Sequence, residues 1–370
     1  MQKTVYHRLM IDKKIIVVIP SYEPPSTFES YVLSLLDNGV YKVVIVNDGS
    51  CDKYNTTYKK IENINGVTLL SYSDNRGKGY ALKFAFNYIK DNFDGDYIIV
   101  TADCDGQHDV FDVLNVALEV SSSNLLVLGS RDFKLENVPK RSSFGNVSTR
   151  KLFKLLYGLN LKDTQTGLRA FSSSLLDFML NISGTRFEYE MNVLIVCHKN
   201  DVTVKEIPVK TIYESKPSDV LKRSHFKTFS DSLRVWTVLF RNVNTYVLAV
   251  VLSLIIEICF FIIGEYSLYK NLYPALRTLL SSVTARVISS AFNYFANYKF
   301  VFNGKGKSTV FKYYALWAGL LASSYLLTNF FGNVLGLPVV LFKVIVDGAL
   351  SIISYRIQTT WVFKHKKNSA

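Results

Sequence analysis

The fold is decided by the stretch YIIVTADCDGQH at positions 97–108, in which an apolar run leads directly into two carboxylates. Tyr97–Val100 has the continuous, β-branched character of a strand that is buried on both faces of a parallel sheet. Ligands of such sheets bind beyond the carboxyl ends of the strands. Asp103 and Asp105 stand at such an end, so the stretch predicts both an α/β sheet and the edge at which its chemistry lies.

Similar apolar runs surround this one between Lys13 and about Pro208, and amphipathic stretches separate them. Strands that alternate with helices indicate an α/β domain with a doubly wound, mostly parallel sheet. Polar residues again follow the strand ends, at Pro20-Ser21-Tyr22 and Asn47-Asp48-Gly49-Ser50. The predicted strands are Ile15–Ile19, Val43–Val46, Val67–Leu70, Tyr97–Val100 and Leu125–Leu128, with helices over Gly79–Asp91 and Val110–Val120.

The composition changes beyond residue 243. Over all 370 residues, 49% are hydrophobic, 20% are charged, and the mean hydropathy is +0.15. These values are too apolar for an ordinary soluble protein and exclude disorder as the dominant state. The four cysteines have neither CxxC spacing nor a matching histidine cluster, so the sequence favours neither a disulfide framework nor a structural zinc site.

The carboxyl-terminal part contains four apolar stretches, each near the ~20 residues that cross a ~30 Å hydrocarbon layer. Lysines lie between the second and third stretches and again after the fourth, which the positive-inside rule places in the cytoplasm. Met1–Lys14 lacks the apolar core of a secretory signal peptide. We therefore expect a multi-pass protein of the cell membrane, with the front domain and both termini in the cytoplasm. The predicted spans are Tyr246–Ile263, Leu276–Tyr298, Phe311–Phe331 and Leu337–Trp361.

A basic, amphipathic segment precedes the first span. Its apolar residues recur every three or four positions among lysines and arginines, which is typical of a helix in the membrane interface. A helix packed on the front domain is the alternative. We therefore divide the chain into a domain over residues 1–221, an interfacial helical linker over 222–242 and a four-helix membrane domain over 243–370. The net charge of +13 then favours anionic lipid over nucleic acid as the partner.

The spans carry a weak internal repeat with an offset of 61 residues. Ser290, Tyr294, Val301 and Phe302 recur as Ser351, Tyr355, Val362 and Phe363. These matches indicate two related helical hairpins.

The pair Asp103 and Asp105 is suited to holding Mg²⁺ or Mn²⁺ against a diphosphate, because these cations prefer oxygen ligands and complete their shell with substrate phosphates. A solvated turn is the alternative for any isolated pair of this kind. Asp48 at another strand end could accept a hydrogen bond from a nucleoside, or form a turn. Gly77-Lys78-Gly79 could begin a helix whose amides and Lys78 face phosphate oxygens.

Taken in order, these motifs resemble glycosyltransferase family 2, specifically the polyprenyl-phosphate glycosyltransferases related to dolichyl-phosphate-mannose synthase. The resemblance covers about residues 13–240, and the remainder resembles GtrA-like membrane domains, with Asn293, Trp361-Val362-Phe363 and the four-span layout. The motifs are Ile19–Tyr22, Val46–Ser50, Asn75–Gly79, Asp103–His108, Gly129–Arg131 and Asp163–Arg169.

The resemblance implies a GT-A fold and metal-dependent transfer of a hexose from a nucleotide-diphosphate sugar to a polyprenyl phosphate at the cytoplasmic face, with inversion. It implies Mg²⁺ or Mn²⁺ on Asp103, Asp105 and Gln107. The nucleotide sugar would contact Pro20, Tyr22, Asp48, Lys78, Ala102, Asp103, Gln107 and Arg223; the lipid phosphate would contact Arg131, Arg141 and Arg169; Asp105 and Asp163 would be catalytic.

One departure and two open roles accompany this resemblance. The family's Pro-x-Tyr-Asn-Glu is here Pro20-Ser21-Tyr22-Glu23-Pro24, which puts the nucleotide contact of Glu23 in doubt. An ionised lipid phosphate needs no general base, so Asp163 would orient the acceptor, or belong only to a structured loop. Glu188 or Glu190 would brace basic residues rather than touch substrate.

Two other functions share some of these features. A processive polysaccharide synthase would need a QxxRW motif, and Gln358-Thr359-Thr360-Trp361 lacks its arginine. A flippase for the lipid-linked sugar would use the carboxyl-terminal region. A dinucleotide oxidoreductase is disfavoured because no GxGxxG follows the first strand. The sequence distinguishes neither the sugar nor UDP from GDP.

Overall fold

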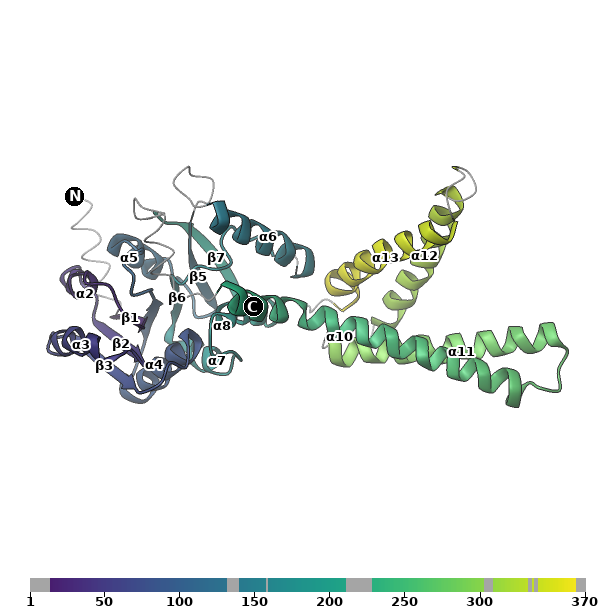
Figure 1. The fold of residues 1–370 in the computed structure, drawn as a ribbon, viewed down its shortest axis with the longest axis horizontal. Coiled ribbons are helices and arrows are strands. Elements are labelled where there is room, and N and C mark those ends of the chain that lie inside the picture. The colour runs from purple at the N-terminus through teal and green to yellow at the C-terminus, as the bar shows by residue number, and fades with distance from the viewer. Residues whose placement is uncertain are drawn as a thin grey trace. The chain divides into compact units, whose positions relative to one another are not determined.

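The computed structural model describes residues 14–131, 140–157, 159–210, 228–302, 309–331, 335 and 339–363. The chain forms two compact units (Figure 1). The sheet unit comprises Met1–Lys154 and Leu159–Val238, and the helical unit comprises Leu155–Gly158 and Leu239–Ala370.

The sheet unit is built on one mixed sheet whose strand order, in the described residues, is β3-β2-β1-β4-β6-β5-β7. Only β6 runs against its neighbours, β4 and β5, and the other pairs are parallel. The strands are β1 (Lys14–Ser21), β2 (Lys42–Asp48), β3 (Val67–Tyr72), β4 (Tyr97–Thr101), β5 (Leu125–Ser130), β6 (Arg169–Ser172) and β7 (Thr203–Pro208).

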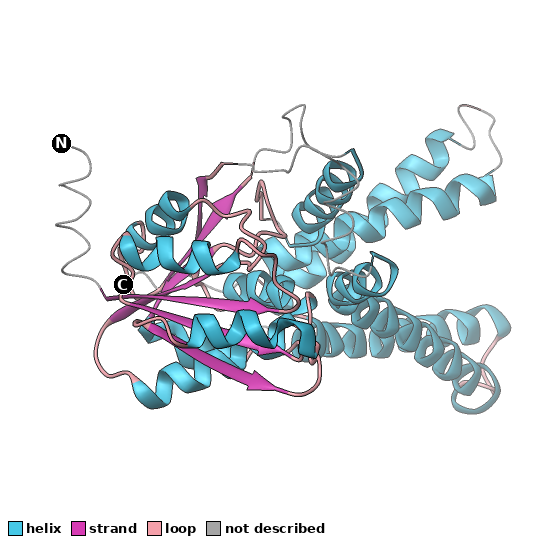
Figure 2. Cartoon of the chain, turned by 60° about the vertical axis from the view of Figure 1, so that its left-hand side comes forward, coloured by secondary structure: helices cyan, strands magenta, loops and turns pink. Residues whose placement is uncertain are grey.

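Helices cover both faces of this sheet (Figure 2). Ile15 and Val17 of β1 pack on one face with Phe28 of α2 and Val113 of α5. Ile16 is equally buried on the other face, because successive side chains of a strand point in opposite directions. Burial on both sides explains the unbroken apolar runs of the central strands. The helices are α2 (Phe28–Asp37), α3 (Asn55–Glu62), α4 (Lys78–Asn92), α5 (Val110–Leu118), α6 (Lys140–Tyr157), α7 (Leu176–Leu180) and α8 (Glu188–Lys199).

The α/β sheet predicted from the sequence is confirmed, and all five predicted strands are present. The prediction missed β6 and β7, and with them the mixed character of the sheet. β6 has only four residues, Arg169–Ser172, and begins with a charged side chain. β7 is an edge strand, TVKEIP, whose residues are exposed or half-buried. Neither has the apolar run by which a buried strand is recognised.

The helical unit contains α10 (Thr228–Ile263) from Leu239 onward, together with α11 (Pro274–Ala296), α12 (Thr309–Asn329) and α13 (Val339–Ile357). These helices occupy the ranges of the four predicted spans. Helices α10, α11 and α13 continue into π-helical turns, at Gly264–Leu268, Asn297–Val301 and Gln358–Val362, and Phe330 and Phe331 after α12 are also π-helical. Among the described residues, one helical stretch, Thr237–Leu268, is long and apolar enough to cross a membrane.

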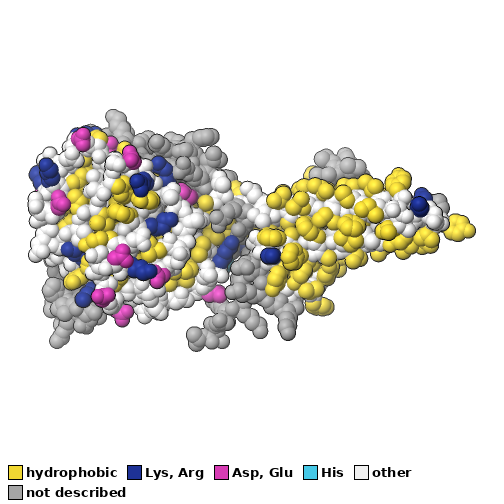
Figure 3. All heavy atoms as spheres, turned by 90° about the horizontal axis from the view of Figure 1, so that it is seen from below, with side chains coloured by type: hydrophobic (Ala, Val, Ile, Leu, Met, Phe, Trp, Pro, Cys, Tyr) yellow, Lys and Arg dark blue, Asp and Glu magenta, His cyan; other side chains and the backbone are white. Residues whose placement is uncertain are grey.

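The surface of the helical unit is largely apolar, and Figure 3 shows the hydrophobic side chains covering its visible face. A soluble protein rarely exposes so continuous an apolar surface, so this unit is suited to contact with lipid. The exposed residues include Val247, Leu254, Ile258, Val283, Val287, Phe311, Leu326 and Ile352.

The start of α10 differs from the expected linker. Helix α10 runs without interruption from Thr228 to Ile263, so the predicted interfacial helix and first span share one helix over the described residues. Residues 241–246, RNVNTY, contain no glycine or proline that would break it. Residues 211–227 lie outside the described residues, and the predicted domain boundaries stay predictions.

Candidate active site

The first acidic group of the site follows β4. Asp103 and Asp105 lie just beyond the last residue of β4, Thr101, whose hydroxyl donates to the carbonyl oxygen of Gly167 at 2.7 Å. This bond joins the end of β4 to the loop that precedes β6. The adjacency of β4, β6 and β5 therefore brings the Asp163–Gly167 segment to the same edge of the sheet as the acidic pair.

Asp103 is held by two cations or potential cations. One carboxylate oxygen lies 2.6 Å from Lys78 Nζ, and the other lies 3.2 Å from Nε2 of His108. Burial alone would raise the pKa of Asp103, but the Lys78 ammonium and the hydrogen bond from His108 together hold it well below its usual range. Asp103 is consequently ionised at neutral pH.

Lys78 joins two acidic residues that are far apart in the sequence. Its ammonium lies 2.6 Å from Asp103 and 2.8 Å from Glu190 of α8. Burial would lower the pKa of Lys78, but the two carboxylates raise it above its normal value. Gly167 covers this cluster, and a Cβ at that position would stand 2.5 Å from an Asp103 oxygen and 2.6 Å from Lys78 Nζ. A larger residue at this position would therefore force the Asp103 carboxylate and the Lys78 ammonium to shift.

Asp105 completes the acidic pair. One of its oxygens accepts the Gln107 backbone N–H at 3.0 Å. Burial, followed by the neighbouring charge of Asp103, raises the pKa of Asp105. Two adjacent carboxylates with incomplete neutralisation form a hard oxygen donor set that suits Mg²⁺ or Mn²⁺.

The donor set fits a cation that is shared with a substrate. Within the described residues, no group of three or more His, Cys, Asp or Glu side chains is arranged to hold a metal. Mg²⁺ commonly binds one or two carboxylates and takes its remaining ligands from substrate phosphates and water. Asp103 and Asp105 match that pattern, whereas the side chain of Gln107 stays a predicted ligand.

A second charged pair stands at the end of β5. Arg131 Nε donates to Asp163 at 2.7 Å, and a second guanidinium nitrogen lies 3.4 Å from the other carboxylate oxygen. Asp163 is completely buried, and its backbone N–H donates to Glu206. The pair fixes the direction of the arginine, because a guanidinium and a carboxylate match in two-point geometry. Asp163 therefore positions Arg131, and its predicted catalytic role stays a prediction.

Asp48 is used inside the fold. Its carboxylate is 3% exposed and accepts hydrogen bonds from the Tyr72 hydroxyl and from the backbone N–H groups of Arg76 and Gly77. Burial raises the pKa of Asp48, although these hydrogen bonds act in the opposite direction. The structure thus gives Asp48 the task of fixing the turn before α4, and its predicted nucleoside contact stays a prediction.

The first predicted nucleotide contacts lie along the end of β1. Pro20 is buried and Tyr22 is half-buried. Ala102 is also buried, and its N–H donates to Val18 in β1. Glu23 has a left-handed backbone with φ of 49°, and its N–H donates to the Ser50 hydroxyl. These backbone groups adjoin the carboxyl ends of β1 and β4, which is the edge at which ligands of such sheets bind.

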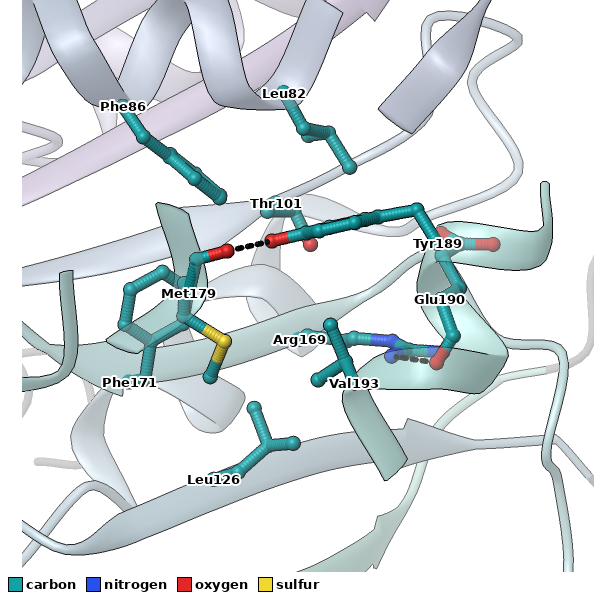
Figure 4. Close-up of a pocket in the computed structure, with 10 residues that line it drawn as sticks. All are labelled: Leu82, Phe86, Thr101, Leu126, Arg169, Phe171, Met179, Tyr189, Glu190 and Val193. Atoms are coloured by element: carbon teal, nitrogen blue, oxygen red, sulfur yellow. Dashed lines mark hydrogen bonds between the residues drawn. The ribbon is translucent and has the colours of Figure 1, made fainter. Parts of the chain in front are cut away.

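Arg169 lies in the interior of the domain, and its predicted contact with the lipid phosphate stays a prediction. The side chain is 5% exposed and donates to the backbone carbonyl of Thr166 at 3.0 Å. It also donates to the backbone carbonyl of Glu190 at 2.8 Å (Figure 4). Arg169 is buried because it is the first residue of β6, which pairs with β4 on one side and β5 on the other inside the domain. Arg169 therefore braces the loop before β6 against α8.

Two further predicted residues cannot be placed as side chains. Arg223 lies outside the described residues. Arg141 belongs to α6, but its side chain is outside the described part of the chain.

The site also includes residues that sequence reasoning had left without a function. His108 belongs to the motif Asp103–His108 but has no predicted role, and no sequence pattern indicates Glu206. Glu190 braces Lys78, which is one of the alternatives predicted for it. The family resemblance indicated Glu190, whereas Glu206 lies in edge strand β7 and carries no local signal.

Comparisons with known proteins agree with this arrangement. Residues 16–181 match Glycosyl transferase family 2, and residues 245–363 match the GtrA/DPMS transmembrane domain. A UDP-N-acetylglucosamine–dolichyl-phosphate N-acetylglucosaminyltransferase of Methanococcus voltae is 32% identical over 228 residues, which cover 55% of this chain and 88% of that protein. The chain belongs to glycosyltransferase family 2, as the motifs predicted.

Other relatives are similar over the same part of the chain. An uncharacterized protein of Methanocaldococcus jannaschii is 32% identical and covers 54% of this chain and 82% of its own length. The dolichyl-phosphate beta-glucosyltransferase of Saccharomyces cerevisiae is 27% identical and covers 52% of this chain and 65% of its own. Glucosyl-3-phosphoglycerate synthase from Mycobacterium tuberculosis is 19% identical with a TM-score of 0.49, over 65% of this chain and 81% of that chain.

Proposed function

We propose that this glycosyltransferase transfers one hexose from a nucleotide-diphosphate sugar to a polyprenyl phosphate of the dolichyl type. The observation that carries the proposal is the Asp163–Gly167 segment, which touches both charged parts of the site. Gly167 packs directly against the Asp103 carboxylate, and the Asp163 carboxylate accepts a hydrogen bond from Arg131. One loop therefore contacts both the acidic pair, which would hold a metal and the donor diphosphate, and the guanidinium, which would bind a second phosphate. Two relatives named as transferases to dolichyl phosphate support this choice of acceptor.

Asp103 and Asp105 would hold Mg²⁺ or Mn²⁺, which would neutralise the departing diphosphate. Before the metal and donor bind, the Lys78 ammonium neutralises Asp103 in place of the metal cation. Its ammonium, with the N-terminus of α4 behind it, lies beside the acidic pair and is suited to an incoming phosphate.

The acceptor chemistry follows from the charge of the lipid phosphate. This group is ionised at neutral pH and can attack the anomeric carbon without a general base, so inversion requires only positioning. Arg131, oriented by buried Asp163, would bind the acceptor phosphate. Arg141 on α6 would add a second cation for the same phosphate.

The membrane topology belongs to the same proposal. The four helices α10 to α13 would cross the bilayer, with residues 1–221 as the catalytic domain, 222–242 at the interface and 243–370 as the membrane domain. The apolar exterior of the helical unit supports this placement. Lys299 and Lys312 flank the connection between α11 and α12, which supports a cytoplasmic position for that end of the helices and for the catalytic domain.

The test is a screen of labelled UDP- and GDP-sugars with polyprenyl phosphates, using membranes that contain the protein. The expected product is a lipid with one sugar per phosphate, soluble in organic solvent. Asp105→Asn should abolish its formation, and Asp96→Asn, the same change at an exposed loop position, should not. Full turnover by Asp105→Asn would overturn the metal assignment, and a polymeric product would replace the proposal with a processive synthase.

A further inference from the structure

The helical unit contains a structural duplication that is clearer than its sequence repeat. The π-helical turn after α11 spans Asn297–Val301, and the turn after α13 spans Gln358–Val362. The two turns are offset by 61 residues, which is also the offset of the sequence matches. The π-turns that end α11 and α13 therefore occupy equivalent positions, which marks α10–α11 and α12–α13 as related hairpins.

Aromatic contacts cross between these hairpins in a symmetric way. Tyr246 of α10 packs on Tyr355 of α13 with ring centroids 5.4 Å apart and planes at 68°. Tyr313 of α12 packs on Tyr294 of α11 at 5.3 Å and 67°. Tyr294 and Tyr355 are the residues that repeat. The first helix of each hairpin therefore packs against the second helix of the other hairpin, as expected for a two-fold arrangement.

The hydrogen bonds follow the same symmetry. The Tyr313 hydroxyl donates to Asn293, which also accepts from the Asn297 amide. At the equivalent positions, the Tyr246 hydroxyl donates to Ser354, which accepts from the Gln358 amide. Each hairpin contains two helices, so the chain ends each hairpin on the side at which it began, and both hairpins start from the same side. The two-fold axis that relates them therefore runs along the helices. Transporters built from parallel repeats bind their substrates at such an interface.

A cavity of about 290 Å³ lies between the two hairpins. Its wall contains the Glu257–Arg286 ion pair, with 3.1 Å between the nearest atoms. Gln358 is 4% exposed, and its amide oxygen has no hydrogen-bond partner. An unsatisfied buried acceptor costs stability unless a ligand or water donates to it. The polar lining is completed by Tyr246, Ser253, Ser289, Ser290, Asn293, Tyr313 and Ser354.

These features define the chemistry of a ligand. The hydroxyls and amides share the wall with apolar side chains, and this mixture suits a sugar, whose hydroxyls need hydrogen bonds and whose C–H groups pack on apolar surface. The apolar lining residues are Val250, Leu254, Leu316, Trp317 and Leu320. The volume limits the ligand to about one sugar ring, since small-molecule sites begin at roughly 300 Å³. Arg286 carries five N–H donors, and Glu257 faces only one side of the guanidinium. The remaining donors suit a phosphodiester at the cavity mouth.

We propose that this cavity binds the glycosyl phosphate head group of a polyprenyl lipid, with the sugar among Asn293, Ser354 and Gln358 and the phosphodiester at Arg286. The lipid carrier is the one element that rests on the proposed function. All residues that line this cavity belong to the helical unit, whereas the described residues of the proposed nucleotide-sugar site belong to the sheet unit.

The test is titration calorimetry of the full chain in detergent, with short synthetic lipids and without donor. The probes are citronellyl phosphoglucose, citronellyl phospho-N-acetylglucosamine and citronellyl phosphate. We expect at least one glycosylated lipid to bind about tenfold more tightly than citronellyl phosphate. Gln358→Leu should weaken that binding about fivefold, since it removes one hydrogen bond. Thr360→Val, two positions along and exposed, should leave it unchanged.

Equal affinity for glycosylated and unglycosylated lipids would overturn the proposal, as would wild-type affinity in Gln358→Leu. If Gln358→Leu fails to fold, wild-type protein is labelled instead with the N-acetylglucosamine lipid carrying a photoreactive diazirine on its sugar. Labelling within 246–257, 286–293 or 354–358 supports the site, and labelling only in the sheet unit overturns it. No catalytic turnover is needed in either assay, so a failure of the transfer screen is distinguishable from a failure here.

Discussion

Lys78→Met should destabilise the sheet unit far more than the same change at Lys90, although both lysines belong to α4 and both lie 2.6 Å from a carboxylate. Lys78 is 13% exposed and is shared by Asp103 and the buried Glu190. Its removal leaves two carboxylates without their cation, and breaking a buried pair costs about 3–5 kcal/mol. Asp103 is one-third exposed, so water can solvate its carboxylate and offset part of the lost ion-pair energy. We therefore expect the free energy of unfolding to fall by about 3 kcal/mol, the lower end of that range.

For a domain of this size, a loss of about 3 kcal/mol lowers the unfolding temperature by roughly 6–12 °C. Lys90 pairs with exposed Asp177, and an exposed pair stabilises little, so its variant should unfold close to wild type. The measurement is intrinsic fluorescence of the full-length proteins during heating, at pH 7 without divalent cations. Equal unfolding temperatures for the two variants would refute the argument that burial makes Lys78 important.

The remaining predictions concern turnover. Gly167→Ala should reduce transfer at least tenfold, since its Cβ would stand 2.5 Å from an Asp103 oxygen, and unchanged initial rates would contradict this packing. Asp163→Asn should raise the KM for the lipid phosphate about tenfold and leave the donor KM unaltered, because Arg131 loses the carboxylate that directs it; a change confined to the donor would assign the pair to the nucleotide side. Chelation of divalent cations with EDTA should stop lipid-sugar formation, Mg²⁺ or Mn²⁺ should restore it, and full activity in EDTA would exclude the metal.

The central sheet was predictable because its strands are buried on both faces. Burial on both sides demands continuous runs such as Ile15–Ile19 and Tyr97–Val100, and these runs survive in the sequence as a local signal. Edge strand β7 and the four-residue β6 lack such a signal, because their position depends on pairing with distant segments. The four helices of the membrane-like unit were predicted for the same local reason, from their apolar length.

The site was predictable as a set of positions but not as a set of contacts. The sequence identified Asp103, Asp163 and Lys78 as candidates. The Lys78–Glu190 contact spans α4 and α8, and the Arg131–Asp163 contact spans two loops, so no local spacing indicates either. Arg169 lies in a conspicuous motif, but no local spacing indicates its hydrogen bond to the Glu190 backbone in α8.

The crossed tyrosine contacts of the helical unit bear on its ancestry. A single hairpin that paired with a copy of itself about a two-fold axis would form both tyrosine contacts at once, as isologous interfaces do. Joining the two copies in one chain allows each half to mutate alone. Asn293 and Asn297 in the first half already correspond to Ser354 and Gln358 at the equivalent positions of the second half. Fusion therefore permits an asymmetric cavity, which a dimer of identical hairpins could never acquire.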